Sequence, residues 1–205
     1  MNELTDAVGR QHDRATQDVR IVSLVPSLTE LLFSLGLDDQ IVGRTTFCVH
    51  PKEKIDSVPR VGGTKTISFD RLRAARPTHV LVNIDENLRE DVPKIEALGA
   101  IVVVTHPVEP TDNIHLYTLL GNLFNRTDQA SALISAFAEA HRVLAHRREQ
   151  FAPQSVLYLI WRDPWMTVSS HTYISKMLAL VGWQTVPTAS DDRYPQVAPS
   201  DPVWR

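Results

Sequence analysis

Short hydrophobic runs alternate with helical patterns along the first half of the chain. Runs rich in β-branched residues predict four buried strands, at 20–25, 41–43, 79–82 and 101–104. Three intervening stretches have the spacing typical of helices, at 27–36, 68–75 and 86–98. Because strands and helices alternate with short connections, we expect a parallel sheet with right-handed crossovers.

Individual residues indicate where the first two helices begin and end. Ser27 and Glu30 have the spacing of a capping box, and Gly36 can end that helix in a left-handed conformation. Ser68 precedes the next helix as its expected cap, with Asp70 in the first turn. Between these helices lies a long irregular stretch, 45–66. Loops of this length in compact domains are usually functional.

The second half of the chain opens with two helical segments, 111–124 and 127–150. The longer one contains neither Pro nor Gly, so an unbroken helix of roughly 36 Å is expected. A strand at 155–161, a helix at 172–181 and a strand at 183–186 follow. So few elements cannot bury their own faces, which favours a second lobe that continues in a longer protein.

Together these patterns predict an α/β fold. It has a Rossmann-like parallel-sheet N-terminal lobe, a long backbone helix and an incomplete second α/β lobe. The expected boundaries are a disordered tail at 1–19, the N-terminal lobe at 20–124, the connecting helix at 125–150 and the second lobe at 151–205.

Composition narrows the classes of function. Among 205 residues, 21 are basic and 24 acidic, and a net charge of −3 argues against a nucleic-acid-binding surface. No run approaches the ~20 apolar residues of a membrane span. The first 19 residues lack the apolar core of a secretory signal, so the chain as read is expected in the cytoplasm.

Catalytic and metal motifs are weak in this sequence. Ser27 has no flanking glycines of a nucleophile elbow, and no histidine pair has the spacing of a zinc-protease motif. Cys48 and His50 are more simply a small buried thiol and a loop imidazole than metal ligands, and His79 fits a core position. We therefore predict no enzyme activity, no metal site and no covalently bound cofactor.

Aromatic residues indicate a possible function more clearly than the catalytic and metal motifs do. Phe47 lies in the long loop, and Trp161 and Trp165 flank a junction between strand and loop. Exposed aromatic rings in a cleft can stack on flat organic ligands.

Several segments resemble a known family. They are the stretches 20–30, 61–63, 68–70, 76–82 and 98–99. They are similar to class III periplasmic substrate-binding proteins of the helical backbone metal receptor superfamily, with the greatest similarity to the cobalamin-binding branch. These proteins are the receptors of ABC importers for vitamin B12, haem and iron–siderophores. The resemblance, which runs from about residue 20 to 196, implies a ligand held between two lobes, an importer permease as partner and a periplasmic location.

The resemblance also implies roles for single residues. Phe47 and Trp165 fall at positions of ligand-contacting aromatics, whereas Thr64 and Asn83 stand where vitamin B12-binding members place tryptophans. With Lys65, these two residues would supply polar contacts to the ligand.

Asp70 aligns with a first-lobe carboxylate that docks on transporter arginines, a charge-assisted contact. Cobalamin or a related corrinoid is the expected ligand. An iron–siderophore or haem is the nearest alternative, and Arg44, Lys65 and Arg162 are candidate cations for it. A cytosolic metal or tetrapyrrole receptor without a transporter is a further alternative.

Overall fold

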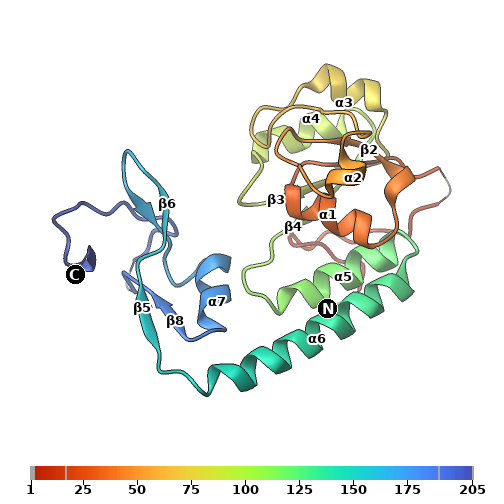
Figure 1. Ribbon diagram of the computed structural model, residues 1–205. Coiled ribbons are helices and arrows are strands. Elements are labelled where there is room, and N and C mark those ends of the chain that lie inside the picture. Colours follow the sequence, from red (N-terminus) through yellow and green to blue (C-terminus); the bar gives the residue numbers. More distant parts are fainter. Residues whose placement is uncertain (1–2, 17, 189, 205) are drawn as a thin grey trace. The chain divides into compact units, whose positions relative to one another are not determined.

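The computed structural model describes residues 3–16, 18–188 and 190–204 (Figure 1). The chain forms two compact units. The N-terminal unit comprises Met1–His106 and His115–Ala132, and the C-terminal unit comprises Pro107–Ile114 and Leu133–Arg205. Both mix helices and strands, as the α/β prediction required.

A four-stranded sheet forms the centre of the N-terminal unit. Its strands are β1 (Ile21–Ser23), β2 (Ile41–Arg44), β3 (His79–Asn83) and β4 (Ile101–Thr105). They pair in the order β2-β1-β3-β4, and every pairing is parallel. The predicted parallel sheet is therefore confirmed, with β2 and β4 at its edges.

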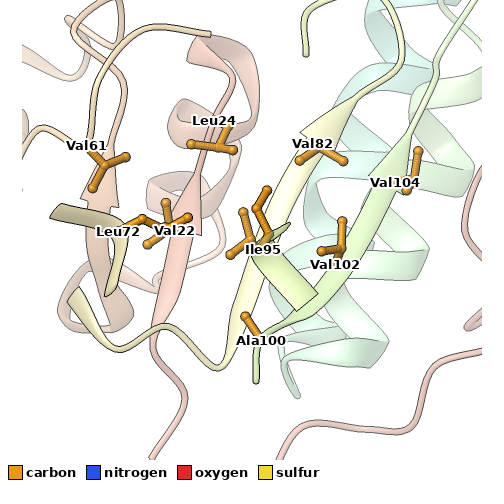
Figure 2. Packing of buried hydrophobic residues seen from close by; sticks show 10 residues of the cluster. Val22, Leu24, Val61, Leu72, Val82, Ile95, Ala100, Val102 and Val104 are labelled. Atoms are coloured by element: carbon orange, nitrogen blue, oxygen red, sulfur yellow. The ribbon is translucent and has the colours of Figure 1, made fainter. Parts of the chain in front are cut away.

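Side chains of alternate residues in β3 pack on opposite faces of this sheet. On one face, Val80 and Val82 join a buried cluster that includes Leu72 of α3 (Phe69–Ala75) and Ile95 of α4 (Val92–Glu96) (Figure 2). On the other face, the ring of His79 lies 5.3 Å from that of Phe124, edge to face. Helices thus cover both faces, which is what an all-parallel sheet needs.

The first helix, α1 (Pro26–Ser34), begins one residue earlier than the predicted capping box. Val25 is its N-cap, and no side chain caps it. Pro26 explains this start, since its fixed φ and missing N–H suit the first helical position. Gly36 ends the helix at a φ of 70°, as predicted.

The predicted helix at 86–98 is wrong in its first half. Residues 84–86 form a turn and Asn87 a bend, followed by the 3-10 helix η2 (Arg89–Asp91) and only then by α4. Asn87 accounts for the difference, because its side-chain oxygen accepts a hydrogen bond from the backbone N–H of Asn83 at 2.8 Å. Asparagine side chains compete in this way with helical hydrogen bonding.

The expected disordered tail at 1–19 is also wrong for the residues that the structure describes. Asp6, which is buried, accepts hydrogen bonds from the backbone N–H of Val104 and from His12, each at 3.1 Å. The backbone N–H of Ala7 donates to the oxygen of Val104 at 2.9 Å. The segment therefore covers β4, an edge strand whose backbone groups need partners.

The long helix α6 (Thr127–Arg148) is continuous over 22 residues, as predicted, and ends two residues early. It follows α5 (Asp112–Leu123). Gly121 and Ala130 allow the two helices to approach closely, because a Cβ added at Gly121 would lie 2.4 Å from that of Ala130. No helix in the described part of the chain is both long and apolar enough to cross a membrane.

The C-terminal unit contains two small sheets. In one, β5 (Gln154–Val156) pairs in parallel with β8 (Trp183–Thr185); in the other, β6 (Leu159–Trp161) pairs antiparallel with β7 (Met166–Thr167). The single strand predicted at 155–161 is thus two strands that belong to different sheets.

The remaining elements are short. They are the helices α2 (Lys52–Ile55) and α7 (Tyr173–Ala179) and the 3-10 helices η1 (Asp38–Gln40) and η3 (Pro202–Trp204).

Candidate functional site

The carboxyl ends of the four parallel strands meet at one edge of the N-terminal unit's sheet, here called the carboxyl edge. In open α/β sheets, ligands bind beside this edge. The loops that follow β2, at 45–51, and β3, at 84–88, lie there. Phe47 and Asn83, both predicted from the sequence, therefore reach the same edge.

Phe47 presents its ring to solvent, with 61% of the residue exposed. Its loop is held in place by the backbone N–H of Thr46, which donates to the oxygen of Gly62 at 2.8 Å. A Cβ added at Gly63 would lie 3.4 Å from Cε2 of the Phe47 ring, so the ring lies against the 62–64 segment. This fixed, exposed aromatic face is suited to stacking on a flat ligand.

Asn87 connects the loops at this edge. Its Nδ2 donates to the backbone oxygens of Thr64 at 2.9 Å and Leu24 at 3.2 Å. Its Oδ1 accepts the hydrogen bond from the backbone N–H of Asn83. The side-chain amide of Asn87 therefore joins three segments of the chain, which lie after β1, before α3 and after β3. Thr64 and Asn83 are thus brought together, as part of one hydrogen-bonded edge.

Sequence reasoning did not identify Asn87. A signal was present, because an asparagine four residues after a strand's last residue can fold its side chain back onto the backbone and shape a turn.

The side chain of Asn83 is directed by two further contacts. Its Oδ1 accepts from the backbone N–H of Asp85 at 2.8 Å, and its Nδ2 lies 3.5 Å from Oγ1 of Thr105. Asp85 in turn lies 3.5 Å from Nε2 of His106 through its Oδ2. The carboxyl edge therefore also carries the carboxylate of Asp85 and the imidazole of His106, which were not among the predicted ligand-binding residues.

Lys65 follows Thr64 and is exposed. Its ammonium group has no hydrogen-bond or ion-pair partner within residues 3–16, 18–188 and 190–204. It is therefore available as a cation next to the carboxyl edge.

A cavity of about 550 Å³ borders the same edge. Val82, Val92 and Val104 supply part of its apolar wall, and Asn83 and Asn87 supply amides. Of the predicted ligand-binding residues, Asn83 lines this cavity and Phe47 does not, so the cavity and the ring of Phe47 are separate features of the edge.

Arg44 is not an available cation, in contrast to the sequence hypothesis. It is 2% exposed and donates to the backbone oxygens of Cys48 at 2.8 Å and Ile55 at 3.0 Å. Burial lowers the pKa of the Arg44 guanidinium, Arg60 lowers it further, and Asp56 opposes both effects. Arg44 therefore holds the 45–58 loop together and cannot reach a ligand.

Cys48 is also buried, at 1% exposed. Its sulfur lies 3.1 Å from the hydroxyl oxygens of Thr29 and Thr45. Among the described residues, no group of three or more His, Cys, Asp or Glu side chains could hold a metal ion.

Trp165 belongs to the C-terminal unit and is half-buried. Its ring lies 5.7 Å from that of Trp204, edge to face, and the guanidinium of Arg162 lies 5.6 Å from its ring centre. A cation and two aromatic rings are thus gathered in this unit.

Asp70 lies in the first turn of α3 with its side chain 95% exposed. One oxygen is 3.3 Å from the guanidinium of Arg73. An exposed pair of this kind contributes little to stability, so Asp70 can exchange this partner for another cation.

Comparison with known proteins defines the class. The family model described as "Periplasmic binding protein" matches residues 21–202, and the chain belongs to that family.

The chain is also similar to curated proteins. The "Vitamin B12-binding protein" of Yersinia pestis (strain Pestoides F) is 25% identical over 179 residues, which are 87% of this chain. The chain spans 64% of the length of that relative.

Two solved structures share the fold. The periplasmic vitamin B12 binding protein BtuF of Vibrio cholerae has a TM-score of 0.79 at 20% identity, over 87% of this chain and 70% of its own. The periplasmic heme-binding protein RhuT from Roseiflexus sp. RS-1 has a TM-score of 0.72 at 25% identity, over 88% and 71%.

Proposed function

We propose that this chain acts in an ABC importer as a substrate-binding protein that holds cobalamin or a related corrinoid without catalysis. The observation that carries the proposal is the exposed ring of Phe47, which lies against the 62–64 segment at the same carboxyl edge as Asn83. A corrin macrocycle is flat and apolar with amide groups at its rim, so it needs an aromatic face and nearby hydrogen-bonding groups.

The proposed roles follow from the chemistry of each side chain. Phe47 stacks on the macrocycle, while Thr64 and Asn83 exchange hydrogen bonds with its amides. Lys65, which is exposed and without a partner in the described residues, pairs with the phosphate of the cobalamin nucleotide. Trp165 supplies a second aromatic contact from the C-terminal unit.

We further propose Asp70 as the residue that docks on the importer's permease. Its carboxylate is almost fully exposed at the start of α3, and Arg73 is its one ion-pair partner among the described residues. A permease arginine would form a paired, charge-assisted contact with it.

A haem or an iron–siderophore is the second candidate ligand. It is supported by the similarity to a heme-binding structure and by the cations Lys65 and Arg162.

Absorbance titration of the 205-residue chain with cyanocobalamin, haemin and ferrichrome tests the ligand class. The proposal expects saturable binding of cyanocobalamin at lower concentration than either other ligand. Tighter binding of haemin or ferrichrome would transfer the assignment to the second candidate, and binding of none of the three would reject the chain as a receptor of this class.

Phe47→Ala tests the stacking contact. Loss of one aromatic face is worth about 1 kcal/mol, so a roughly fivefold weaker affinity for cyanocobalamin is expected. Phe151→Ala is the matched control, because Phe151 is also an exposed phenylalanine, at 67%, and is none of the predicted ligand-binding residues. Equal affinities of the two variants would remove Phe47 from the site.

A further inference from the structure

A second concave site lies along β2, an edge strand of the sheet, and along the 59–61 segment that pairs with Arg44 at the end of that strand. Its volume is about 600 Å³. It is lined by Arg20, directly before β1, and by Ile41 and Val42, which begin β2. None of the residues that line this groove is proposed to bind the corrinoid, so the two sites consist of different residues.

Three arginines line the groove, Arg20, Arg60 and Arg71. The other lining residues are apolar, among them Ile41, Val42 and Val61, and none is acidic. The lining of the groove thus carries three cations and no carboxylate, on a chain whose net charge is −3. The groove therefore has a local charge opposite to that of the whole protein.

Arg20 is held in a fixed position. Its Nε and one terminal nitrogen donate to the backbone oxygen of Ala75, at 3.2 and 2.7 Å, and Nε also donates to that of Arg76 at 3.0 Å. These acceptors are uncharged, so the positive charge of Arg20 is not neutralised by them.

Arg60 and Arg71 are exposed, and within the described parts of the chain neither guanidinium has a hydrogen bond or an ion pair. The charge of Arg60 reaches the neighbouring loop, because it lowers the pKa of the buried Arg44. Two unpartnered guanidinium groups beside a third, fixed one are what a carboxylate or phosphate needs for several simultaneous hydrogen bonds.

We propose that this groove binds the anionic group of a small amphiphilic molecule, with the apolar part of the ligand on Ile41, Val42 and Val61. The guanidinium groups of Arg60 and Arg71 contact the anion. Arg20, which backbone oxygens hold in place, adds a positive charge at the edge of the groove. The volume suits a small organic ligand, since such sites typically enclose about 300–1,000 Å³.

Isothermal titration of the 205-residue chain with three probes tests this assignment. Octyl phosphate carries both an anion and an apolar chain, inorganic phosphate only the anion, and octyl glucoside only the apolar chain, each used below micelle formation. Octyl phosphate is expected to bind most tightly and to weaken as salt is raised. Failure of octyl phosphate to bind, or equal binding of octyl glucoside, would overturn the proposal, and equal binding of inorganic phosphate would overturn the amphiphile assignment.

The double variant Arg60→Gln/Arg71→Gln identifies the site. It is expected to weaken octyl phosphate binding at least tenfold. Arg142→Gln/Arg147→Gln removes the same charge from two exposed positions of α6 and should change the affinity less than twofold. Thermal unfolding of both variants verifies that they fold. Unchanged binding by the folded Arg60/Arg71 variant would place the anion elsewhere and reject the groove, whereas cyanocobalamin binding remains an independent measurement.

Discussion

The two units of this chain differ in how they bury apolar surface. The N-terminal unit contains the valines, leucines and isoleucines of the central sheet, and Ile21, Val80 and Val102 are fully buried. In the C-terminal unit, by contrast, β6 is exposed, with Ile160 at 36% and Trp161 at 64%. Buried polar side chains such as Thr172, Ser175 and Thr185 take a larger share of its interior.

This contrast indicates where the free energy of folding comes from in each unit. Apolar burial, worth roughly 25 cal/mol per Å², stabilises the N-terminal unit. The C-terminal unit depends more on local hydrogen bonds, such as the 2.6 Å contact between Ser175 and Thr185. Units with fewer buried apolar contacts open at lower free energy.

The largest expected effect comes from truncating matched isoleucines in the two units. Ile95→Ala removes a side chain that is 1% exposed, so a loss of about 2–5 kcal/mol in the free energy of unfolding is expected. Ile160→Ala, at a position 36% exposed, should cost less than about 1 kcal/mol. Urea unfolding followed by circular dichroism measures both, and equal losses would contradict the difference between the units.

The pH dependence of stability is a second test, specific to the N-terminal unit. Burial lowers the pKa of His79 from about 6.5 to about 4, with a smaller contribution from His12. Between these pH values the unfolded chain binds more protons at this residue than the folded chain does. The contribution of His79 to the free energy of unfolding is therefore fully present above pH 6.5 and decreases as the pH drops towards 4. The loss contributed by this residue reaches up to about 3 kcal/mol.

His79→Gln removes this titration while keeping a polar side chain beside Thr78. Urea unfolding between pH 4 and 7 is expected to show a shallower loss of stability for the variant than for the original chain. Parallel pH profiles would show that other groups are responsible.

The smallest expected effect concerns helix caps. Thr172 caps α7, and its hydroxyl oxygen accepts from the backbone N–H of Ser175 at 3.3 Å. Thr172→Ala should therefore destabilise α7 by about 1 kcal/mol, measured by faster amide exchange in 173–179. Ser68→Ala is the control at the N-cap of α3, where no side-chain cap bond exists, and it should leave exchange in α3 nearly unchanged. A larger effect at Ser68 would contradict the cap assignment.

Much of the fold could be predicted because the signals are local. Runs of β-branched residues identified all four strands of the parallel sheet, and the absence of Pro and Gly identified α6. Gly36 was placed correctly because left-handed backbone conformation favours glycine. The start of α1 was misplaced by one residue, since the preference of Pro26 for the first helical position prevailed over the capping pattern.

The roles of the predicted site residues remain proposals. The contacts around these residues could not be predicted from the pattern of neighbouring residues in the sequence. Phe47, Thr64 and Asn83 reach one edge through chain segments far apart in sequence, and Asn87 joins those segments. Arg44 resembled a free cation in the sequence, but the loop that folds around it supplies carbonyl acceptors and removes it from solvent.

The amino-acid sequence by itself determined the strands, the long helix, the glycine stop and the family to which the chain belongs. These features depend on neighbouring residues, whose periodicity and backbone preferences are visible in the chain. Tertiary structure alone decided that residues 3–16 cover β4, that Asn87 ties three loops together and that Arg20, Arg60 and Arg71 share one groove. These features depend on contacts between distant segments, which hydrogen bonding and burial establish only after the chain has folded.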